Sequence, residues 1–387
     1  MNIFSRLPAP ARRVGHVVLG VALVGLLASC GSQDTYPLTT LSPKGKQADQ
    51  IHNLVKPVFF IAGIVFVLVQ GLIIFMVIKF RRRRNESDDE RDPKQIHGNT
   101  PLELTWTALP AVILAVLAVT NVQTIFALQE RQPDAIKIDV FGQQWWWEYR
   151  YDTNDDGEFD IITANEMVIP VGQPIELNVQ SRDVIHSFWI PALNGKMDSV
   201  PGRTQFLGFQ ANEPGVYEGQ CTEFCGLSHG YMRMEVKALP PAEYDDWVQS
   251  QQAPPAEPKS ELAQEGRTAF LSQCAYCHQV NGLTSEGDYS GDGPVNDYKG
   301  LEGAALPTVR PGVAPNLTHL MSRNRFAGNM FPLYYKDGTP DEGTLKEWLA
   351  NPDAMKPMMP DNLQGMPNLN LDPATIDALV AYLVTLG

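Results

Sequence analysis

Two long apolar stretches near the start of the chain limit its fold more than any other feature. The first, residues 58–78, would reach about 32 Å as a helix, enough to cross the hydrocarbon core of a bilayer. The second is residues 102–128. Because arginines at 81–84 follow the first stretch at once, the connection between the two belongs on the cytoplasmic side. The sequence predicts a transmembrane helix hairpin over residues 55–130, against the alternative of helices inside a water-soluble core.

The N-terminal segment has the pattern of an export signal. Residues 1–29 begin with basic side chains, continue into an apolar run and end in LLAS before Cys30. This pattern predicts a signal peptide of the lipoprotein type, with Cys30 as the lipidated first residue of the mature chain. The alternative is ordinary signal cleavage nearby, which would leave Cys30 as a free thiol. Residues 30–54 are then an extracytoplasmic N-terminal segment.

Residues 131–240 are rich in short alternating, β-branched runs that are separated by Gly, Pro and Asn. Short strands at regular spacing are typical of an all-β sandwich or barrel. Trp145, Trp146 and Trp147 stand in a row, and successive strand side chains point to opposite faces. We therefore expect at least one of these rings to face outward unless both faces of the strand are covered.

The sequence CTEFCGLSHGYM, residues 221–232, gathers soft metal ligands in one short loop. Cys221 and Cys225 are followed by His229 and Met232, and His186 in HSFWIP is the natural fifth side chain. Thiolate, imidazole and thioether ligands suit copper better than a hard cation. The alternative interpretation is that the cysteines and methionine only pack in a core.

After this loop, residues 241–260 are rich in proline and end in QQAPPAEPKS, which predicts a semi-rigid linker of extended character. A helix is expected over 261–272. The last helix should begin with Asp372 as its cap and Pro373 at its first position. Residues 281–315 are glycine-rich and are interpreted as a loop around a bound group.

The motif CAYCH, residues 274–278, is the attachment signature of a c-type haem, rather than a redox or zinc CxxC. Cys274 and Cys277 would bind the haem covalently, and His278 would be the proximal iron ligand. A Met-Pro step before the last helix would supply the sixth ligand. Met366 in GMPNLNL is favoured, with Met359 in MMPDN as the alternative.

The net charge and the cysteine content argue against two further features, nucleic-acid binding and a structural disulfide. The net charge of -14 argues against nucleic-acid binding, which needs a basic surface, and would attract a cationic partner. Each of the five cysteines already has a place in the lipobox, the metal loop or the haem motif, so none remains for a structural disulfide.

Taken together, GQQWWWEYRY, HSFWIPALNGKMDSVPGR, CTEFCGLSHGYM and CAYCH resemble subunit II of haem-copper cytochrome c oxidase, of the bacterial type with a fused C-terminal cytochrome c. The resemblance covers nearly the whole chain. It implies a multi-domain protein: the transmembrane hairpin, a cupredoxin-like sandwich over residues 131–240 and an all-α cytochrome c domain over residues 261–387.

The resemblance also implies a binuclear copper centre, CuA. Cys221 and Cys225 would bridge both coppers, and His186 and His229 would each bind one. Weaker ligands would be Met232 and the backbone carbonyl of Glu223.

Four further roles follow from the resemblance alone. The carboxylate of Glu223 would bind a magnesium ion at the interface with subunit I, and Asp198 would belong to the same interface. Trp145 matches the residue through which electrons reach copper, and Glu103 the carboxylate at the entrance of a proton channel. The family commonly has His and Tyr where this chain has Gln143 and Trp146.

The resulting hypothesis is an electron-input subunit of a respiratory oxidase in the bacterial cell membrane, with the copper and haem domains on the periplasmic side. Electrons from a cytochrome c or a bc-type complex would pass through haem c and CuA to subunit I, where oxygen is reduced to water with proton pumping; subunit III is a further expected partner. The linker would keep the haem domain at high effective concentration near copper.

Three rival classes share part of this pattern. A membrane-anchored copper-delivery protein also has CxxxC with a distant His, but Met232, His229 and the haem motif speak against it. A quinol oxidase subunit shares the scaffold and lacks the copper ligands, which this chain keeps. A protein like the CuA part of nitrous oxide reductase has no reason for a membrane hairpin.

Overall fold

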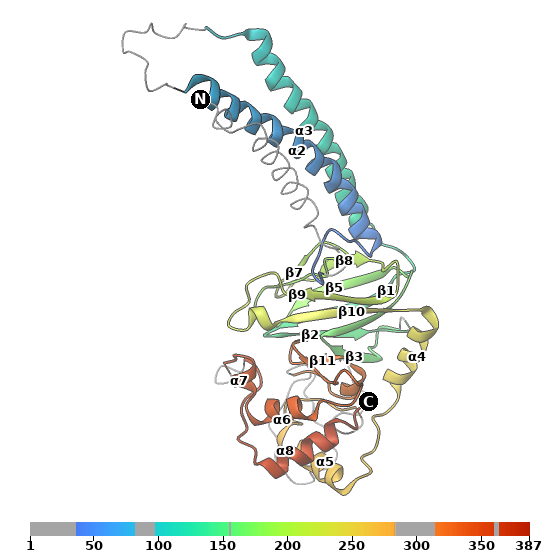
Figure 1. The fold of residues 1–387 in the computed structure, drawn as a ribbon. Coiled ribbons are helices and arrows are strands. Elements are labelled where there is room, and N and C mark those ends of the chain that lie inside the picture. Colours follow the sequence, from blue (N-terminus) through green and yellow to red (C-terminus); the bar gives the residue numbers. More distant parts are fainter. Residues whose placement is uncertain (1–35, 82–96, 155, 282, 284–313, 360–363) are drawn as a thin grey trace, which may run out of the picture.

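The computed structural model describes residues 36–81, 97–154, 156–281, 283, 314–359 and 364–387. A helical hairpin leads into a β sandwich, and a small helical region lies at the opposite end of the sandwich (Figure 1). Three predicted features lie outside the described residues: the signal peptide with Cys30, the last three arginines of the run at 81–84, and most of the loop at 281–315.

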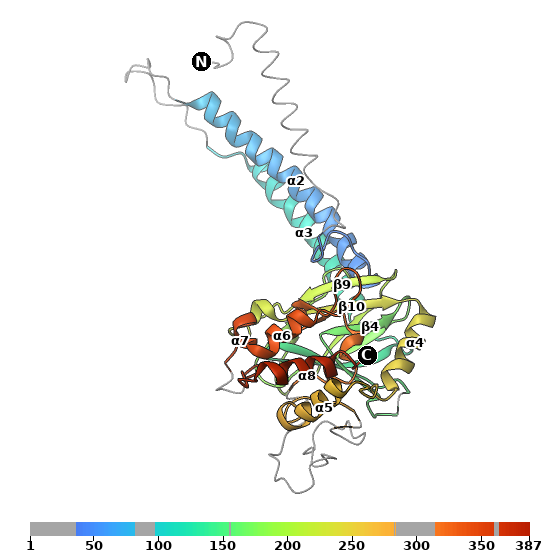
Figure 2. The ribbon, with the colours of Figure 1, turned by 60° about the horizontal axis from the view of Figure 1, so that its bottom comes forward.

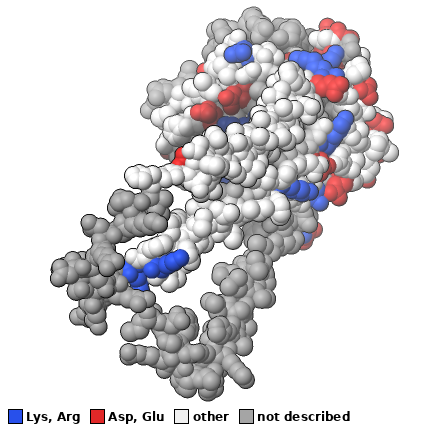
Figure 3. Space-filling view, turned by 90° about the horizontal axis from the view of Figure 1, so that it is seen from above, with Lys and Arg blue, Asp and Glu red and all other residues white. Residues whose placement is uncertain are grey.

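The hairpin consists of α2 (Lys46–Phe80) and α3 (Thr100–Leu128), which pack against each other. No residue in the most apolar part of either helix is buried in this chain, as contact with lipid requires and a water-soluble core would not. Lys79 and Arg81 lie at one end of the hairpin. Residues 57–78 of α2 and 104–128 of α3 carry no charged side chain, and the hairpin is white over most of its surface in Figure 3.

The first turn of α2 rests on the sandwich instead of in the apolar span. Ala48 is buried there, and its N–H donates to the carbonyl of Leu193 at 3.0 Å. The N–H of Lys46 likewise donates to the carbonyl of Gln210 at 3.0 Å. These contacts fix the hairpin to the sandwich and leave the apolar part of α2 for the bilayer.

The sandwich has a five-stranded sheet in the order β3-β2-β1-β5-β8 and a three-stranded sheet in the order β4-β10-β9, with a short β6-β7 ribbon. In the larger sheet β1 pairs antiparallel with β2 and parallel with β5. The strands are β1 (Ile136–Gln143), β2 (Trp146–Tyr151), β3 (Ile161–Ala164), β4 (Glu166–Pro170), β5 (Ile175–Ser181), β6 (His186–Phe188), β7 (Met197–Ser199), β8 (Gln205–Phe209), β9 (Gly215–Gln220) and β10 (Arg233–Leu239), with a 3-10 turn at His229–Tyr231.

All three tryptophans are buried, with exposed fractions of 2% for Trp145, 7% for Trp146 and 0% for Trp147. Trp145 lies in the turn between β1 and β2, beyond the end of the paired strands. Both faces of this part of the chain are therefore covered, which is the condition under which none of the three rings faces outward. No tryptophan of this run is free to meet an outside partner.

The prediction of an extended linker after the sandwich is wrong for its first half. Residues 241–252 form the helix α4 (Pro241–Gln252), which follows the edge of the sandwich (Figure 2). Proline suits the first helical position because its missing N–H would have no partner there. Trp247 stacks on Tyr244 and packs edge-on against Tyr151 of β2, at ring-centroid distances of 5.7 and 5.3 Å. This aromatic packing stabilises a helix that composition alone did not indicate.

The C-terminal region is built on α5 and α8, and the helices predicted at 261–272 and after Asp372 are both present. They pack so closely that a Cβ on Gly266 would lie 1.8 Å from the carbonyl oxygen of Ala378, so only glycine fits there. The elements are α5 (Glu261–Gln273), α6 (Glu342–Ala350), α7 (Pro352–Met355), α8 (Pro373–Leu383), the small ribbon of β11 (Arg325–Phe326) and β12 (Phe331–Pro332), and a 3-10 turn at Leu320–Ser322.

Candidate metal centre and haem site

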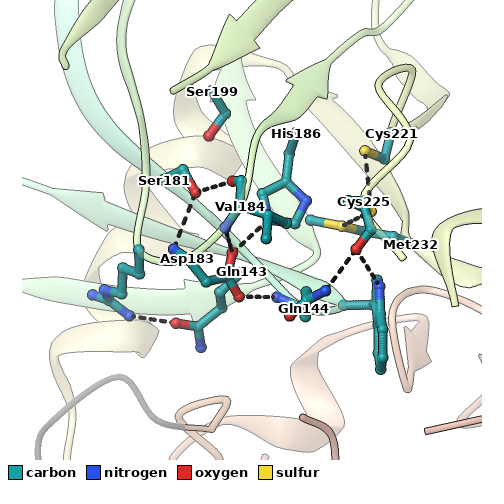
Figure 4. Close-up of polar contacts among 12 residues, drawn as sticks. Gln143, Gln144, Ser181, Asp183, Val184, His186, Ser199, Cys221, Cys225 and Met232 are labelled. Carbon is teal, nitrogen blue, oxygen red and sulfur yellow. Dashed lines mark hydrogen bonds and ion pairs between the residues drawn. The ribbon is translucent and has the colours of Figure 1, made fainter. Parts of the chain in front are cut away.

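The loop after β9 brings its sulfur atoms together, as the sequence predicted. The Sγ of Cys225 lies 3.8 Å from the Sγ of Cys221, 3.8 Å from the Sδ of Met232 and 3.5 Å from the Nδ1 of His229. All three sulfur-bearing residues are buried. Figure 4 shows their sulfur atoms gathered beside the ring of His186. The arrangement is a compact set of soft ligands.

His186 reaches this cluster from β6. Its Nε2 donates to Asp183 Oδ1 at 2.8 Å, so Nδ1 is the free ligand nitrogen. Nδ1 is buried without a hydrogen-bond partner among the described residues, and one ring nitrogen lies within 4.8 Å of both cysteine sulfurs. A carboxylate that fixes the far nitrogen of a histidine is the usual support of a metal ligand. The cluster therefore fits a metal ion, and its donor atoms favour copper.

The protonation of the cluster agrees with this interpretation. A hydrogen bond from Cys225 lowers the pKa of Cys221 to about 4, although burial opposes the shift. The same hydrogen bond, together with burial, raises the pKa of Cys225. Without metal the pair thus shares one proton, and a soft cation that replaces this proton would leave two thiolate ligands.

The structure treats Glu223 and Asp198 differently. The backbone carbonyl of Glu223 lies 3.3 Å from the Sγ of Cys221, inside the ligand cluster, while its side chain is exposed. Asp198 accepts a hydrogen bond from Ser187 Oγ at 2.8 Å, and the Ser187 carbonyl accepts from Thr222 of the metal loop at 3.1 Å. The carbonyl of Glu223 is therefore placed for a ligand role. The magnesium role of the Glu223 carboxylate and the place of Asp198 at the interface with subunit I stay predictions.

Trp145 joins the metal loop to the C-terminal region. Its indole Nε1 donates to the carbonyl of Cys225 at 3.0 Å. Gln144 Nε2 donates to the same carbonyl at 2.7 Å. From the other side, the Nζ of Lys356 donates to the carbonyl of Trp145 at 2.7 Å. Trp145 is thus hydrogen-bonded both to the metal loop and to the C-terminal region.

Glu103 lies at the start of α3, where it accepts a hydrogen bond from the N–H of Asn99 at 2.9 Å. The side chain of Asn99 in turn accepts from the N–H of Leu102 at 3.2 Å. Both bonds satisfy amide donors that have no partner inside the helix. Glu103 therefore caps this helix, and its role at a proton channel stays a prediction.

The haem motif lies at the C-terminal end of α5. Cys274 is buried and Cys277 exposed, and the N–H groups of Cys277 and His278 both donate to the carbonyl of Cys274 at 3.0 Å, which closes one tight turn. The Nδ1 of His278 donates to the carbonyl of Pro315 at 2.9 Å, leaving Nε2 free. Burial lowers the pKa of His278, which favours the neutral imidazole that iron requires.

The two candidate methionines differ in their surroundings. Met366 is half-buried and packs against the hydrophobic cores of both the sandwich and the C-terminal region. The indole Nε1 of Trp348 lies 3.1 Å from its Sδ. Met359 is 37% exposed and pairs through its backbone with Gln364. A sulfur fixed by a hydrogen bond at the meeting of two cores is the better candidate ligand, so we retain Met366.

Sequence reasoning missed the contacts that dock the C-terminal region on the sandwich. The backbone N–H of Asn324 donates to Glu166 Oε2 at 2.9 Å, and its side chain donates to Glu235 Oε1 at 2.8 Å. Asn329 Nδ2 donates to Glu235 Oε2 at 3.0 Å. The sequence signal that could have indicated these contacts is the presence of glutamates within the buried strands β4 and β10. The C-terminal region is therefore docked and not merely tethered.

Glu166 and Glu235 are paired across neighbouring strands, and this pair predicts a pH dependence. Burial, and then the hydrogen bond with Glu235, raise the pKa of Glu166 from 4.5 to about 7. The folded form holds this proton where the unfolded chain has lost it, so stability should fall as the pH rises between these two values. We expect Glu166→Gln, which keeps a neutral hydrogen-bonding group, to flatten this dependence in unfolding temperatures of the detergent-purified chain.

The matched control is Glu218→Gln on β9, which removes one carboxylate that is 3.9 Å from Arg325 and partly exposed. Its pH dependence should resemble that of the unaltered chain. An equal slope in the Glu166→Gln variant and the unaltered chain would contradict the assignment of a shared proton.

Comparison with known proteins places these parts in one family. Residues 39–124 match the transmembrane domain and residues 160–239 the periplasmic domain of the cytochrome c oxidase subunit II family, and residues 263–387 match the cytochrome c family. The chain is 33% identical to cytochrome c oxidase subunit 2 of Alkalihalophilus pseudofirmus, over 90% of this chain and 91% of that one.

Two further proteins are similar to it. Cytochrome c oxidase subunit 2 of Bacillus sp. (strain PS3) is 33% identical, over 93% of this chain and 94% of its own length. The crystal structure of the periplasmic domain of subunit II of cytochrome oxidase of Bradyrhizobium japonicum is 31% identical and covers 31% of this chain and 96% of its own, with a TM-score of 0.29. The predicted fold class, with two apolar helices, a cupredoxin-like sheet domain and a helical cytochrome c region, is confirmed by the family matches.

Proposed function

Because the chain belongs to the cytochrome c oxidase subunit II family, and so to a haem-copper terminal oxidase complex, we propose that it delivers electrons through a covalent haem c and a binuclear CuA centre to subunit I. Oxygen reduction to water, coupled to proton pumping, would take place in subunit I. Two observations on His186 carry the copper part of this proposal. Its buried Nδ1 has no hydrogen-bond partner among the described residues, and one nitrogen of the same ring lies within 4.8 Å of two cysteine sulfurs.

The metal loop supplies the ligands for the copper pair. Cys221 and Cys225 would hold both copper ions through their sulfur atoms, which lie 3.8 Å apart. His186 and His229 would each complete one ion, with Met232 and the carbonyl of Glu223 as weaker ligands. Bound here, the copper pair would accept and release one electron with little change in geometry. Asp183 would keep the ring of His186 in place by its hydrogen bond.

The C-terminal region supplies the haem ligands. Cys274 and Cys277 would hold the haem covalently, and His278 would bind its iron through Nε2, with the ring oriented by Pro315. Met366 would be the sixth ligand, and His/Met ligation would give the high potential that an electron carrier needs.

The same proposal places the protein in the bacterial cell membrane, with the sandwich and cytochrome domain on the periplasmic side. The basic end of the hairpin would be cytoplasmic. Cys30 would carry a lipid anchor, and an unmodified mature N-terminus in mass spectrometry would contradict this. Subunits I and III would be neighbours, and Glu103 would face a proton channel of subunit I. Glu223 would share magnesium with subunit I, and Asp198 would lie at the same interface. The donor would be a cytochrome c or a bc-type complex.

Metal and haem analysis of the purified oxidase tests the proposal against the copper-delivery alternative. We expect two tightly held copper ions and one covalent haem on this chain, with the spectrum of a mixed-valence copper pair. A single copper ion that chelators remove easily would favour a delivery protein instead.

A further inference from the structure

Lys356 follows α7 of the cytochrome domain and is almost completely buried, with an exposed fraction of 4%. Its Nζ donates to the carbonyl of Trp145 at 2.7 Å and to the carbonyl of Ala327 at 3.2 Å. Trp145 belongs to the copper domain and Ala327 to the cytochrome domain. The single ammonium group therefore connects the two domains at the residue that hydrogen-bonds the Cys225 carbonyl.

Gly328, which lies against Lys356, cannot be replaced by a residue with a side chain without a clash. Gly328 has a φ of +76°, and a Cβ there would lie 2.5 Å from Lys356 Nζ, 2.6 Å from the carbonyl of Tyr231 and 3.0 Å from that of Trp145. The carbonyl of Gly328 also accepts a hydrogen bond from the N–H of Arg233 at 3.0 Å. The two domains thus meet backbone to backbone, in a register that only glycine at this position permits.

The residues after Lys356 extend the contact in both directions. Ser228, which lies in the metal loop between Cys225 and His229, donates a hydrogen bond from its hydroxyl to the carbonyl of Pro357. Met358 packs in the hydrophobic core of the copper domain, and its Sδ accepts a hydrogen bond from the N–H of Met366 at 3.2 Å. One short segment therefore contacts the copper loop and the proposed iron ligand.

A lysine is a costly choice for this position. Burial lowers the pKa of Lys356 to about 7, because the charged form loses its hydration. An apolar side chain of similar length would fill the same space without that cost. What it could not do is donate hydrogen bonds to one carbonyl in each domain.

We propose that Lys356 is a positioning residue that holds the cytochrome domain against Trp145, so that electrons reach copper through the fused haem and not from a soluble donor docked on this tryptophan. The inference rests on the proposed function. In the step concerned, one electron leaves the reduced haem and is accepted by the oxidised copper pair, and Lys356 neither gains nor loses a bond or proton. The role of Lys356 is to fix the distance between the haem and the copper pair.

The test compares Lys356→Met with Lys346→Met in the purified oxidase. Lys346 is in the same domain, but it is exposed, and its partner at 2.8 Å is Asp377 of the same domain. We expect Lys356→Met to slow electron transfer from photoreduced haem to copper by about tenfold, because the loss of both hydrogen bonds loosens the contact that sets the distance between the two centres. Hydrogen exchange at the N–H of Arg233, measured on the chain in either metal state, should accelerate. Haem and copper content and haem reduction by a soluble donor should not change.

Lys346→Met should leave every one of these quantities unchanged. A Lys356→Met variant with the transfer rate and Arg233 exchange of the unaltered oxidase would overturn the proposal. If the Lys356→Met variant fails to incorporate haem, Gly328→Ala takes its place, since the added Cβ would push apart the same contact from a neighbouring loop. Slower electron transfer in Gly328→Ala supports the proposal, and an unchanged rate overturns it. Failure of the proposed function looks different, because the unaltered oxidase would then show no transfer from haem to copper.

Discussion

Replacing Cys221 by Ser is expected to remove the copper centre and with it the electron input of the oxidase. Cys221 is the more acidic of the two thiols, and its sulfur lies 3.8 Å from that of Cys225 and 3.3 Å from the carbonyl of Glu223. A serine hydroxyl is a hard donor that stays protonated near neutral pH, so it binds copper poorly. Changes of mere supporting groups cost about 10- to 100-fold in metal affinity or activity. We therefore expect oxygen consumption to fall by roughly two orders of magnitude or more.

The chain contains its own folding control for this variant. The haem motif lies in another domain, so the haem c spectrum should persist while copper, measured by elemental analysis and electron paramagnetic resonance, is lost. Gly230→Ala is a matched variant in the same loop, because a Cβ there meets open space. It should retain copper. A Cys221→Ser oxidase with full copper content and turnover would remove the basis of the ligand assignment.

Replacing Met366 by Ala is expected to abolish the His/Met signature of the haem. The sulfur of Met366 is fixed by the indole of Trp348 at 3.1 Å and by packing against both domain cores. Axial ligands set haem potentials over a range of about 0.8 V, and losing a thioether should lower the potential by on the order of 0.1 V. Redox titration followed by haem absorbance measures both effects.

Met359→Ala is the comparison that decides between the two candidates. Met359 is 37% exposed, so its truncation should leave both spectrum and potential unchanged. The reverse pattern, with the signature lost in Met359→Ala and kept in Met366→Ala, would show that the assignment is wrong. Copper content should be the same in both variants.

Features that depend on neighbours in sequence were predictable. The metal loop places four of the five predicted ligand side chains between Cys221 and Met232, so spacing alone indicated a shared site. His186 also came within reach of the two cysteines, as predicted. The last helix begins at Pro373 under an Asp372 cap, since both signals are local. The apolar spans lie within α2 and α3 for the same reason.

Features that depend on distant parts of the chain were not predictable. The docking of the cytochrome domain uses Asn324, Lys356 and Gly328, which contact residues far away in the sequence and have no local pattern. The helix α4 depends on the packing of Trp247 against Tyr151, which composition does not reveal. The burial of all three tryptophans at 145–147 likewise depends on cover from distant parts of the chain, which the run itself does not reveal.

The most direct test of electron delivery from haem to copper is to photoreduce the haem c of the purified oxidase and follow both centres in time. We predict that haem oxidation and copper reduction proceed together, with one first-order rate that does not depend on protein concentration, because the cytochrome domain is docked on Trp145 of the same chain. A rate that rises in proportion to protein concentration, or copper that stays oxidised while the haem remains reduced, would contradict this account.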